Sequence, residues 1–344
     1  MLAVKDERPG RDEGSLPELR RNPATGIWTI LAPARKLRPG AHRGREKAEG
    51  EPCPFCPGNE RMTPPEVWAE GRESGEPDSP GWRIRVFPNL YPALTPEGSK
   101  GISRGRGGAR RAFGYHEVIV HTPHHDRSLA SMEEEELRRL VEAYRGRYRE
   151  LCGRRGVSQV MIIVNHGREA GASLPHPHAQ VFALPRVPSA VREELREFRR
   201  VEGRCPLCSE AKAARREGRT VAANRTWEAF APFASRSPYE VWLAPRRHAP
   251  DFARAGGKEL EGMADMLLRV MRGLAELLED PPYNLWLHSA PCDGKDYHYY
   301  HYHLEVVPRL TTVAGFELST GMYIDVLPPE EAASRLKERM ARGV

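Results

Sequence analysis

The sequence lacks any long hydrophobic run. None of its apolar stretches approaches the roughly 18–20 residues that are needed to span a bilayer. The first residues, MLAVKDERPGRDEG, also lack the apolar core of a secretory signal. With 344 residues, 39% of them hydrophobic and 29% charged, the composition is that of a soluble globular protein with room for two domains. We therefore expect a cytoplasmic protein that makes no contact with a membrane.

The sequence also has little clustering of charges of one sign. The net charge is only +6, and acidic residues are interleaved with basic ones over most of the chain, as in Met132–Arg155. A nucleic-acid-binding protein more often concentrates its basic residues on one stripe. This pattern suggests affinity for small anions and argues against a nucleic-acid partner.

Cysteine is scarce, but it is not scattered. Four of the six cysteines form two C-P-x-C units, Cys53/Cys56 and Cys205/Cys208, while Cys152 and Cys292 stand alone and are assigned no role. In a reducing compartment such pairs are more often metal ligands than disulfides. The two units therefore predict metal binding.

The chain repeats itself. Each half contains a C-P-x-C, a strand leading to a histidine, a long amphipathic helix, a second strand, and an H-x-H that enters a third strand. The expected helices are Met132–Arg154 and Lys258–Leu278, and the H-x-H motifs are His176–His178 and His301–His303. We therefore predict an α+β fold of two tandem units, each an antiparallel sheet with a covering helix. The predicted domains are 15–188 and 201–344, joined by a helix at Ser189–Arg200.

Each repeat supplies a set of zinc ligands. Zinc favours four soft or borderline ligands in a tetrahedron, and two cysteines with two histidines are a common set. The predicted sites are Cys53, Cys56, His125 and His176 in the first half, and Cys205, Cys208, His248 and His301 in the second. Competing ligands are His116 and His124 in the first half and His298 and His303 in the second. Alternatively, His116 and His121 are strand residues that face solvent or lie in the core with their hydrogen bonds satisfied.

A zinc-ribbon nucleic-acid module is the alternative for the cysteine pairs. Such a ribbon places its second C-x₂-C about 15–20 residues after the first. Here Cys205 follows Cys56 by 149 residues (205 − 56), so one ribbon cannot contain both pairs. The spacing disfavours this alternative.

The segment from Asn165 to Gln180 is the strongest candidate for chemistry. Its glycines and small residues allow backbone N–H groups to approach phosphate oxygens. In an extended H-P-H the two rings share one face, so His176 can bind zinc while His178 stays off the metal. A neutral imidazole can attack phosphorus without a separate base, and Gln180 can donate to a phosphoryl oxygen as charge develops. The alternative for this motif is a metal site without chemistry.

The second half differs at the corresponding positions. Glu305 stands where the first half has Gln180, and a carboxylate there would repel an α-phosphate. Its loop, SAPCDGKDYHYY, also replaces small residues with aromatic and charged ones. We therefore expect the first half to be catalytic and the second to be structural, or to complete a substrate pocket.

Four segments together closely resemble the galactose-1-phosphate uridylyltransferase family of the histidine-triad superfamily. They are H-P-H-A-Q at 176–180, C-P-F-C-P-G-N-E at 53–60, R-R-N-P-A-T-G-I-W-T-I-L-A-P-A-R at 20–35 and G-F-E at 315–317. The resemblance extends from about residue 20 to residue 336 and agrees with the duplication, because that family has two histidine-triad-like halves.

The resemblance implies roles for individual residues. It places the uridylylated nucleophile on His178, the glutamine that hydrogen-bonds the phosphoryl group on Gln180, and zinc on the first of the two predicted sites. The implied substrate contacts are Arg35, Arg38, Phe55, Asn89, Asn165 and Ser173. The resemblance also implies a homodimer in which a C-terminal segment with Gly315, Phe316 and Glu317 serves the sugar site of the partner.

Departures from the family pattern leave the sugar and the base open. The lysine before G-F-E and the glutamine after it, which contact the hexose in the best-known members, are Thr311 and Tyr323 here. The segment GFELSTGMYI looks instead like the branch that includes ADP-glucose phosphorylase. The family's iron site is expected to be absent, with the second Cys-containing site in its place.

The sequence thus predicts a zinc-containing UDP-glucose–hexose-1-phosphate uridylyltransferase that works by a ping-pong reaction. His178 attacks the α-phosphorus of UDP-glucose, glucose 1-phosphate leaves, and galactose 1-phosphate then takes UMP from the histidine. Zinc positions His176 rather than substrate, because four protein ligands leave no open position. The alternatives are an ADP-glucose phosphorylase-type adenylyltransferase that uses inorganic phosphate, a histidine-triad hydrolase, and a zinc-dependent nucleic-acid-binding protein.

Overall fold

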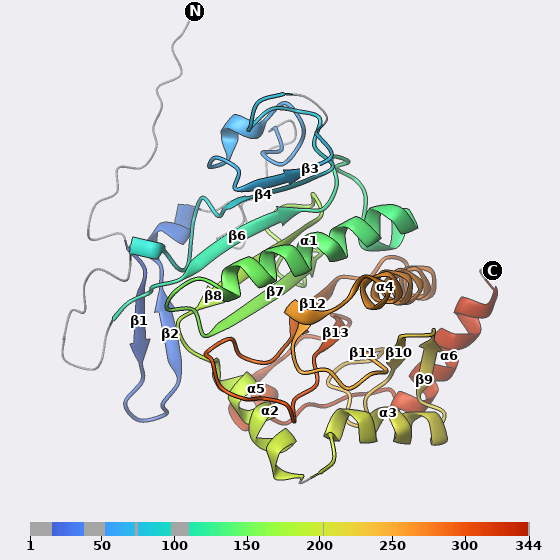
Figure 1. Cartoon of the computed structure of the whole chain (residues 1–344). Coiled ribbons are helices and arrows are strands. Elements are labelled where there is room, and N and C mark those ends of the chain that lie inside the picture. The colour runs from blue at the N-terminus through green and yellow to red at the C-terminus, as the bar shows by residue number, and fades with distance from the viewer. Residues whose placement is uncertain (1–15, 38–51, 73–74, 98–109, 202, 343–344) are drawn as a thin grey trace, which may run out of the picture.

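The computed structural model describes residues 16–37, 52–72, 75–97, 110–201 and 203–342. Within this part of the chain a ten-stranded antiparallel sheet has the order β3-β4-β6-β8-β7-β12-β13-β11-β10-β9 (Figure 1). Its strands are β3 (Trp68–Glu70), β4 (Ile84–Pro88), β6 (Tyr115–Val120), β7 (Gln159–His166), β8 (His178–Leu184), β9 (Thr220–Ala223), β10 (Trp227–Phe230), β11 (Val241–Pro245), β12 (Tyr283–His288) and β13 (His303–Pro308). A separate sheet, β2-β1-β5, contains β1 (Glu18–Arg21), β2 (Trp28–Leu31) and β5 (Arg110–Arg111).

The order of the strands shows the repeat. From the centre outward, β7-β8-β6-β4 on one side mirrors β12-β13-β11-β10 on the other. The two halves meet where β7 pairs with β12, in a register that places Ile162 opposite Leu287 and Asn165 opposite Asn284. The predicted α+β fold of two tandem units is therefore confirmed, and the two units share one continuous sheet.

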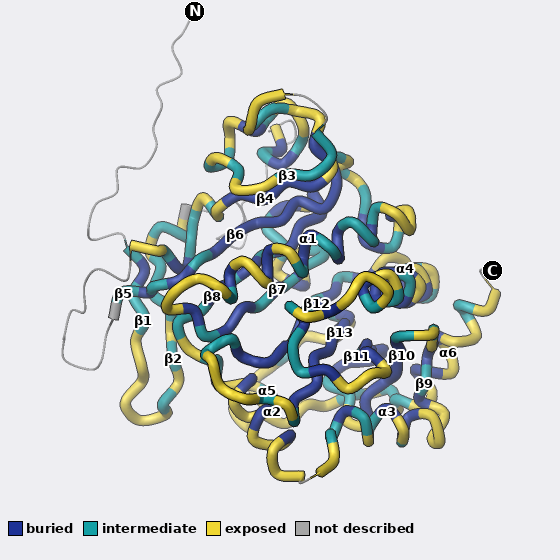
Figure 2. Tube along the Cα trace, in the orientation of Figure 1, coloured by how far each residue is buried: buried dark blue, intermediate teal, exposed yellow. Residues whose placement is uncertain are grey.

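Helices cover both faces of the sheet. They are α1 (Glu134–Cys152), α2 (Ser189–Arg200), α3 (Pro206–Arg216), α4 (Gly257–Leu278), α5 (Gly315–Thr320) and α6 (Pro329–Arg342). Helices α1, α4 and α6 bury their apolar residues against one face, in a core that runs through both halves. Helices α2 and α3 pack on the opposite face of the second half only. Figure 2 shows the buried strands between helices whose outer sides are exposed.

The two long helices form because their apolar residues recur with helical spacing. In α1 the buried side chains include Leu137, Leu140, Val141 and Tyr144, which lie on one side of the helix. The helix begins after Glu133, whose backbone N–H donates to Glu136 Oε2 at 2.9 Å in a capping box. Among the described residues, no helix combines the length and the apolarity that a membrane crossing requires.

Candidate active site and metal clusters

The first predicted ligand set lies together in the structure. The side chains of Cys53, Cys56, His125 and His176 place their ligand atoms within 4.8 Å of one another. Cys56 Sγ lies 3.4 Å from His125 Nδ1 and 3.6 Å from His176 Nδ1, and Cys53 Sγ lies 3.8 Å from His176 Nδ1. All six cysteines are free thiols. Two sulfur and two imidazole donors fit a closed tetrahedral zinc site.

A tight turn presents the first two sulfurs. The backbone N–H of Cys56 donates to the carbonyl of Cys53 at 3.2 Å, and the Asn59 side-chain amide donates to the same carbonyl at 2.9 Å. Gly58 has a φ of +92°, which a side chain would strain, so glycine suits this position. The C-P-F-C-P-G-N-E sequence at 53–60 therefore forms a compact turn, which we call the knuckle.

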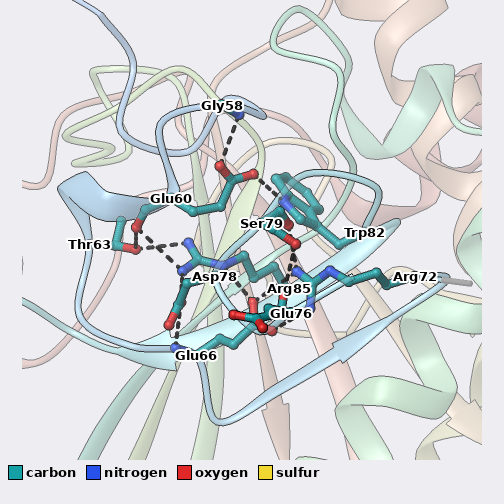
Figure 3. Close-up of polar contacts among 10 residues, drawn as sticks. All are labelled: Gly58, Glu60, Thr63, Glu66, Arg72, Glu76, Asp78, Ser79, Trp82 and Arg85. Carbon is teal, nitrogen blue, oxygen red and sulfur yellow. Dashed lines mark hydrogen bonds and ion pairs between the residues drawn. The ribbon is translucent and has the colours of Figure 1, made fainter. Parts of the chain in front are cut away.

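A buried polar network holds this knuckle against the sheet (Figure 3). Glu60 accepts hydrogen bonds from the Gly58 backbone at 2.9 Å and from the Trp82 indole at 2.8 Å. Below it, the guanidinium of Arg85, with 1% of its side chain exposed, pairs with Glu66 at 2.9 Å and with Asp78 at 2.5 Å. Burial alone would raise the pKa of Glu66, but the hydrogen bonds from Arg72 and Arg85 outweigh it and lower that pKa. The ion pairs and hydrogen bonds offset the desolvation cost of the buried charges, so the network can support the turn.

A second contact fixes the tautomer of His176. Its Nε2–H donates to the carbonyl of Thr122 at 2.8 Å, so the lone pair of the ring is on Nδ1, which faces the sulfurs. Burial lowers the pKa of His176 to about 4, which keeps the ring neutral at physiological pH. Both effects prepare Nδ1 to ligate a metal ion.

The second predicted ligand set also lies together. His301 Nδ1 is 3.6 Å from Cys205 Sγ and 3.3 Å from Cys208 Sγ, and Cys208 Sγ is 3.8 Å from His248 Nδ1. His301 Nε2–H donates to the Pro245 carbonyl at 3.0 Å, so its tautomer matches that of His176. The local backbone differs, however, because this C-P-x-C begins helix α3 with Cys205 as the N-cap and Pro206 in its first turn.

A third group of potential ligands was not predicted. Glu194 of α2 and His288 and His303 of the second half place one ligand atom each within 4.8 Å of one another. Both Glu194 oxygens are buried, and they lie 3.0 Å from His288 Nδ1 and 3.2 Å from His303 Nε2. Buried donor atoms that face each other in this way could hold a cation. No local pattern of residues indicated this group, because Glu194 was expected only in a linking helix.

His178 begins β8, two residues after His176 of the first Cys/His cluster. It is 7% exposed, and its Nδ1–H donates to the His176 carbonyl at 2.8 Å. This hydrogen bond keeps the proton on Nδ1 and the lone pair on Nε2. The ring of Phe55 meets it edge-on at a centroid distance of 5.2 Å. In that tautomer Nε2, rather than Nδ1, is the ring nitrogen without a proton.

A cavity of about 10 Å³, room for a single water molecule, borders His178 beside the loop at 167–177. It is lined by residues that include Asn165, Gly167, Leu174, Pro177 and His178. The amide of Asn284 donates to Asn165 Oδ1 at 2.8 Å, which leaves the amide hydrogens of Asn165 as donors for a ligand. Gln180 lies two residues along β8 from His178, where its Oε1 is 3.0 Å from His116 Nε2.

The structure separates the remaining predicted contacts into two regions. Arg35 donates to the Tyr91 carbonyl at 2.8 Å, Asn89 lies 3.3 Å from His116, and Ser173 is half-buried in the loop before His176. Gly315, Phe316 and Glu317 are elsewhere, in the exposed first turn of α5. Arg38 lies outside the described residues.

Neither Cys/His cluster contains the predicted competing ligands His116, His124, His298 and His303, or the predicted strand residue His121. His116 faces Gln180 and Asn89, and the ring of His121 lies 2.8 Å from the Tyr144 hydroxyl on the helix-covered face of the sheet. The carbonyl of His298 accepts a hydrogen bond from His248 Nε2–H at 2.7 Å, while its own ring pairs with Asp296. His303 belongs to the third group.

Comparisons with known proteins agree with this arrangement. A family described as galactose-1-phosphate uridyl transferase, N-terminal domain, matches residues 9–188, and a domain of unknown function (DUF4921) matches residues 114–343. The chain is 32% identical to an ADP-glucose phosphorylase of Arabidopsis thaliana (95% of this chain, 94% of that protein) and 30% identical to a galactose-1-phosphate uridylyltransferase of Thermotoga maritima (93% and 98%).

Solved structures give the same result. A crystal structure of an Arabidopsis thaliana ADP-glucose phosphorylase with bound ADP-glucose is similar with a TM-score of 0.75 and 31% identity, covering 94% of this chain and 99% of that one. A structure of a uridylyltransferase is similar with a TM-score of 0.79 and 29% identity, covering 95% and 99%. The likeness therefore extends over both halves of the sheet.

Proposed function

This chain belongs to the galactose-1-phosphate uridylyltransferase family, and on that premise we propose that it moves UMP between UDP-glucose and galactose 1-phosphate through a covalent intermediate on His178. The observation that carries the proposal is the hydrogen bond from His178 Nδ1–H to the His176 carbonyl, because it directs the Nε2 lone pair away from the backbone. A nucleophile prepared in this way needs no separate base.

The reaction has two displacements. In the first, His178 Nε2 forms a bond to the α-phosphorus of UDP-glucose, the bond from that phosphorus to the bridging oxygen breaks, and glucose 1-phosphate leaves. In the second, a phosphate oxygen of galactose 1-phosphate attacks the same phosphorus, and the bond to Nε2 breaks. Gln180 and Asn165 are proposed to donate hydrogen bonds to the phosphoryl oxygens, and Phe55, Asn89, Ser173, Arg35 and Arg38 to contact the nucleotide. Such donors stabilise the charge that develops in each transition state.

Zinc is proposed at the two Cys₂His₂ clusters. In the first half it would be held by Cys53, Cys56, His125 and His176, and in the second by Cys205, Cys208, His248 and His301. A closed four-ligand site supplies rigidity rather than Lewis-acid chemistry. In the first half that rigidity would fix His176, whose carbonyl orients the nucleophile. Free thiols at both sites fit the proposed cytoplasmic location.

The test is to incubate the protein with UDP-glucose alone. We expect release of one equivalent of glucose 1-phosphate and a gain in protein mass equal to one uridylyl group, that is, UMP less one water molecule. The His178→Gln variant should show neither, while its zinc content stays that of the wild type. An adduct that forms equally in the variant would rule out His178 as the nucleophile.

A second candidate is transfer of AMP from ADP-glucose to inorganic phosphate. It is favoured by the similarity over nearly the whole chain to an ADP-glucose phosphorylase, including a structure with bound ADP-glucose. A side-by-side assay of ADP-glucose with phosphate against UDP-glucose with galactose 1-phosphate decides between the two. The preferred pair should give the higher kcat/KM, because kcat/KM measures the discrimination between substrates.

We also propose that the protein is a homodimer. The segment around α5 exposes large apolar side chains to solvent: Phe316, Leu318, Met322, Ile324 and Val326. A row of exposed apolar residues of this kind is typical of an interaction surface. Sedimentation should show a dimer that the double variant Leu318→Glu/Val326→Glu converts to monomer; a wild-type monomer would contradict the proposal.

A further inference from the structure

We propose that His116 is a positioning residue for Gln180, because its ring determines which end of the Gln180 amide faces the phosphoryl group. The inference rests on the function proposed above, in which Gln180 donates to a phosphoryl oxygen. It concerns a residue that the sequence suggested only as a competing metal ligand or a strand residue.

The pairing of β6 with β8 places the two side chains on one face of the sheet. In this register His116 lies opposite Phe182, Val118 opposite Gln180 and Val120 opposite His178. Because side chains alternate along a strand, His116 and Gln180 point to the same side as the nucleophile. His116 is 3% exposed and its ring stacks on Phe182 at a centroid distance of 4.1 Å. Its position is thus set by packing.

The proton on the His116 ring is placed by the backbone. The N–H of Ala93 donates to His116 Nδ1 at 3.1 Å. A ring nitrogen that accepts a hydrogen bond carries no proton, and a neutral imidazole has its one proton on the other nitrogen. A backbone N–H cannot become an acceptor, so this contact fixes His116 as the Nε2–H tautomer.

The tautomer then orients the side-chain amide of Gln180. His116 Nε2–H donates to Gln180 Oε1 at 3.0 Å, which turns the carbonyl oxygen of Gln180 toward His116 and leaves its two amide hydrogens for a ligand. Asn89 is held by the backbone instead: its Oδ1 accepts from the Tyr91 N–H at 2.9 Å, which leaves its Nδ2 at 3.3 Å from His116 Nε2, a contact between two donors. Without His116, the amide of Gln180 could rotate and present its oxygen to the phosphate, where it would repel instead of donate.

Three single variants test the role. His116→Phe keeps the aromatic ring and its stacking on Phe182 but removes both nitrogens. We expect single-turnover release of glucose 1-phosphate from UDP-glucose to slow roughly tenfold, the factor that corresponds to one neutral hydrogen bond. The loss should appear in kcat with little change in KM, because the donor acts in the transition state. His116→Gln, which can place an N–H near the position of Nε2, should recover most of the rate. Phe182→Leu removes the stacking but leaves the hydrogen bond from Ala93 to the ring, and should slow the reaction less than His116→Phe does.

A double variant separates positioning from general damage. Gln180→Ala should slow the reaction by about 10²–10³-fold, as expected for loss of one oxyanion donor. Because His116 acts through Gln180, His116→Phe/Gln180→Ala should be no slower than Gln180→Ala alone. If His116→Phe costs the same factor with and without Gln180, or raises KM alone, the positioning role is overturned. A wild-type protein that forms no nucleotidyl adduct would overturn the proposed function itself, and that result is visible before any variant is compared.

Discussion

The H-x-H motifs of the two halves have the same local backbone geometry but different surrounding residues. His178 and His303 both donate from Nδ1 to the carbonyl of the preceding histidine, at 2.8 Å and 3.0 Å. Two residues later the first half has the neutral Gln180, whereas the second has Glu305, which forms an ion pair with Arg236 and lies 3.3 Å from His303 Nε2. The same strand geometry therefore carries opposite electrostatics.

The difference extends to what covers each histidine. In the second half α2 packs its apolar residues over this face of the sheet, and its Glu194 lies 3.2 Å from His303, which is 0% exposed. Burial lowers the pKa of His303, but the attraction of Glu194 and Glu305 outweighs it and raises that pKa. In the first half a cavity borders His178. A duplicated fold can thus keep one copy of a site for chemistry and use the other as an internal charge network.

The proposed difference in function between the two halves is tested most directly at His178 and His303. His178→Gln should reduce glucose 1-phosphate release by at least about 10⁴-fold, because it removes the nucleophile. His303→Gln should keep activity within roughly tenfold of wild type, because His303 makes no contact with the cavity. Comparable losses in both variants, measured by single turnover with UDP-glucose, would show that the halves share the chemistry.

Substitution of Gln180, two residues after the proposed nucleophile, should have the next largest effect on the rate. Gln180→Glu gives the first half the residue that the second half has at this position, Glu305. It replaces a hydrogen-bond donor with a carboxylate that repels the phosphoryl oxygens. We expect kcat to fall about 10²–10³-fold, the range for losing an oxyanion donor, with the zinc content unchanged. A rate close to wild type in steady-state assays would mean that Gln180 does not face the phosphoryl group.

The reverse exchange should act on stability. Glu305→Gln removes a buried partner of Arg236 and His303, and breaking a buried pair from one side typically costs about 3–5 kcal/mol. Urea unfolding should show a loss of this order. Glu331→Gln, which breaks the exposed pair with Arg335, is the matched control and should change the unfolding free energy by less than about 1 kcal/mol. Equal effects of the two substitutions would contradict the buried network.

The smallest expected effect distinguishes the two proposed zinc sites. The second site includes the exposed His248, whereas the first has the buried His176 and Cys53. A chelator should therefore release zinc in two phases, the second site first. Activity followed in the same samples should decline with the slow phase; a decline with the fast phase would assign the catalytic support to the second site.

The sequence predicted the elements that have their own periodicity. Helix α2 occupies its expected range, Ser189–Arg200, and α1 begins two residues after the predicted Met132 because Glu133 caps it. The two Cys/His sets were predictable because the repeat carries each ligand at a matching place. The prediction of the family is confirmed by the comparisons.

Relations between distant strands and helices were not predictable from local pattern. The pairing of β7 with β12 has no signal in either strand, since both alternate in the same way. Glu194 meets His288 and His303 only because α2 folds back on the second half, and His116 meets Gln180 only through the register of β6 on β8. The boundaries 15–188 and 201–344 remain a prediction.

The central β7–β12 pair has a consequence for dissecting this protein. A cut at α2 would leave β7, eight residues long, or β12, six residues long, as a bare edge strand in each fragment. Both strands are largely apolar, and an unpaired apolar edge invites association with other chains. Each fragment expressed alone should therefore aggregate, whereas co-expressed fragments should find each other and restore the full sheet.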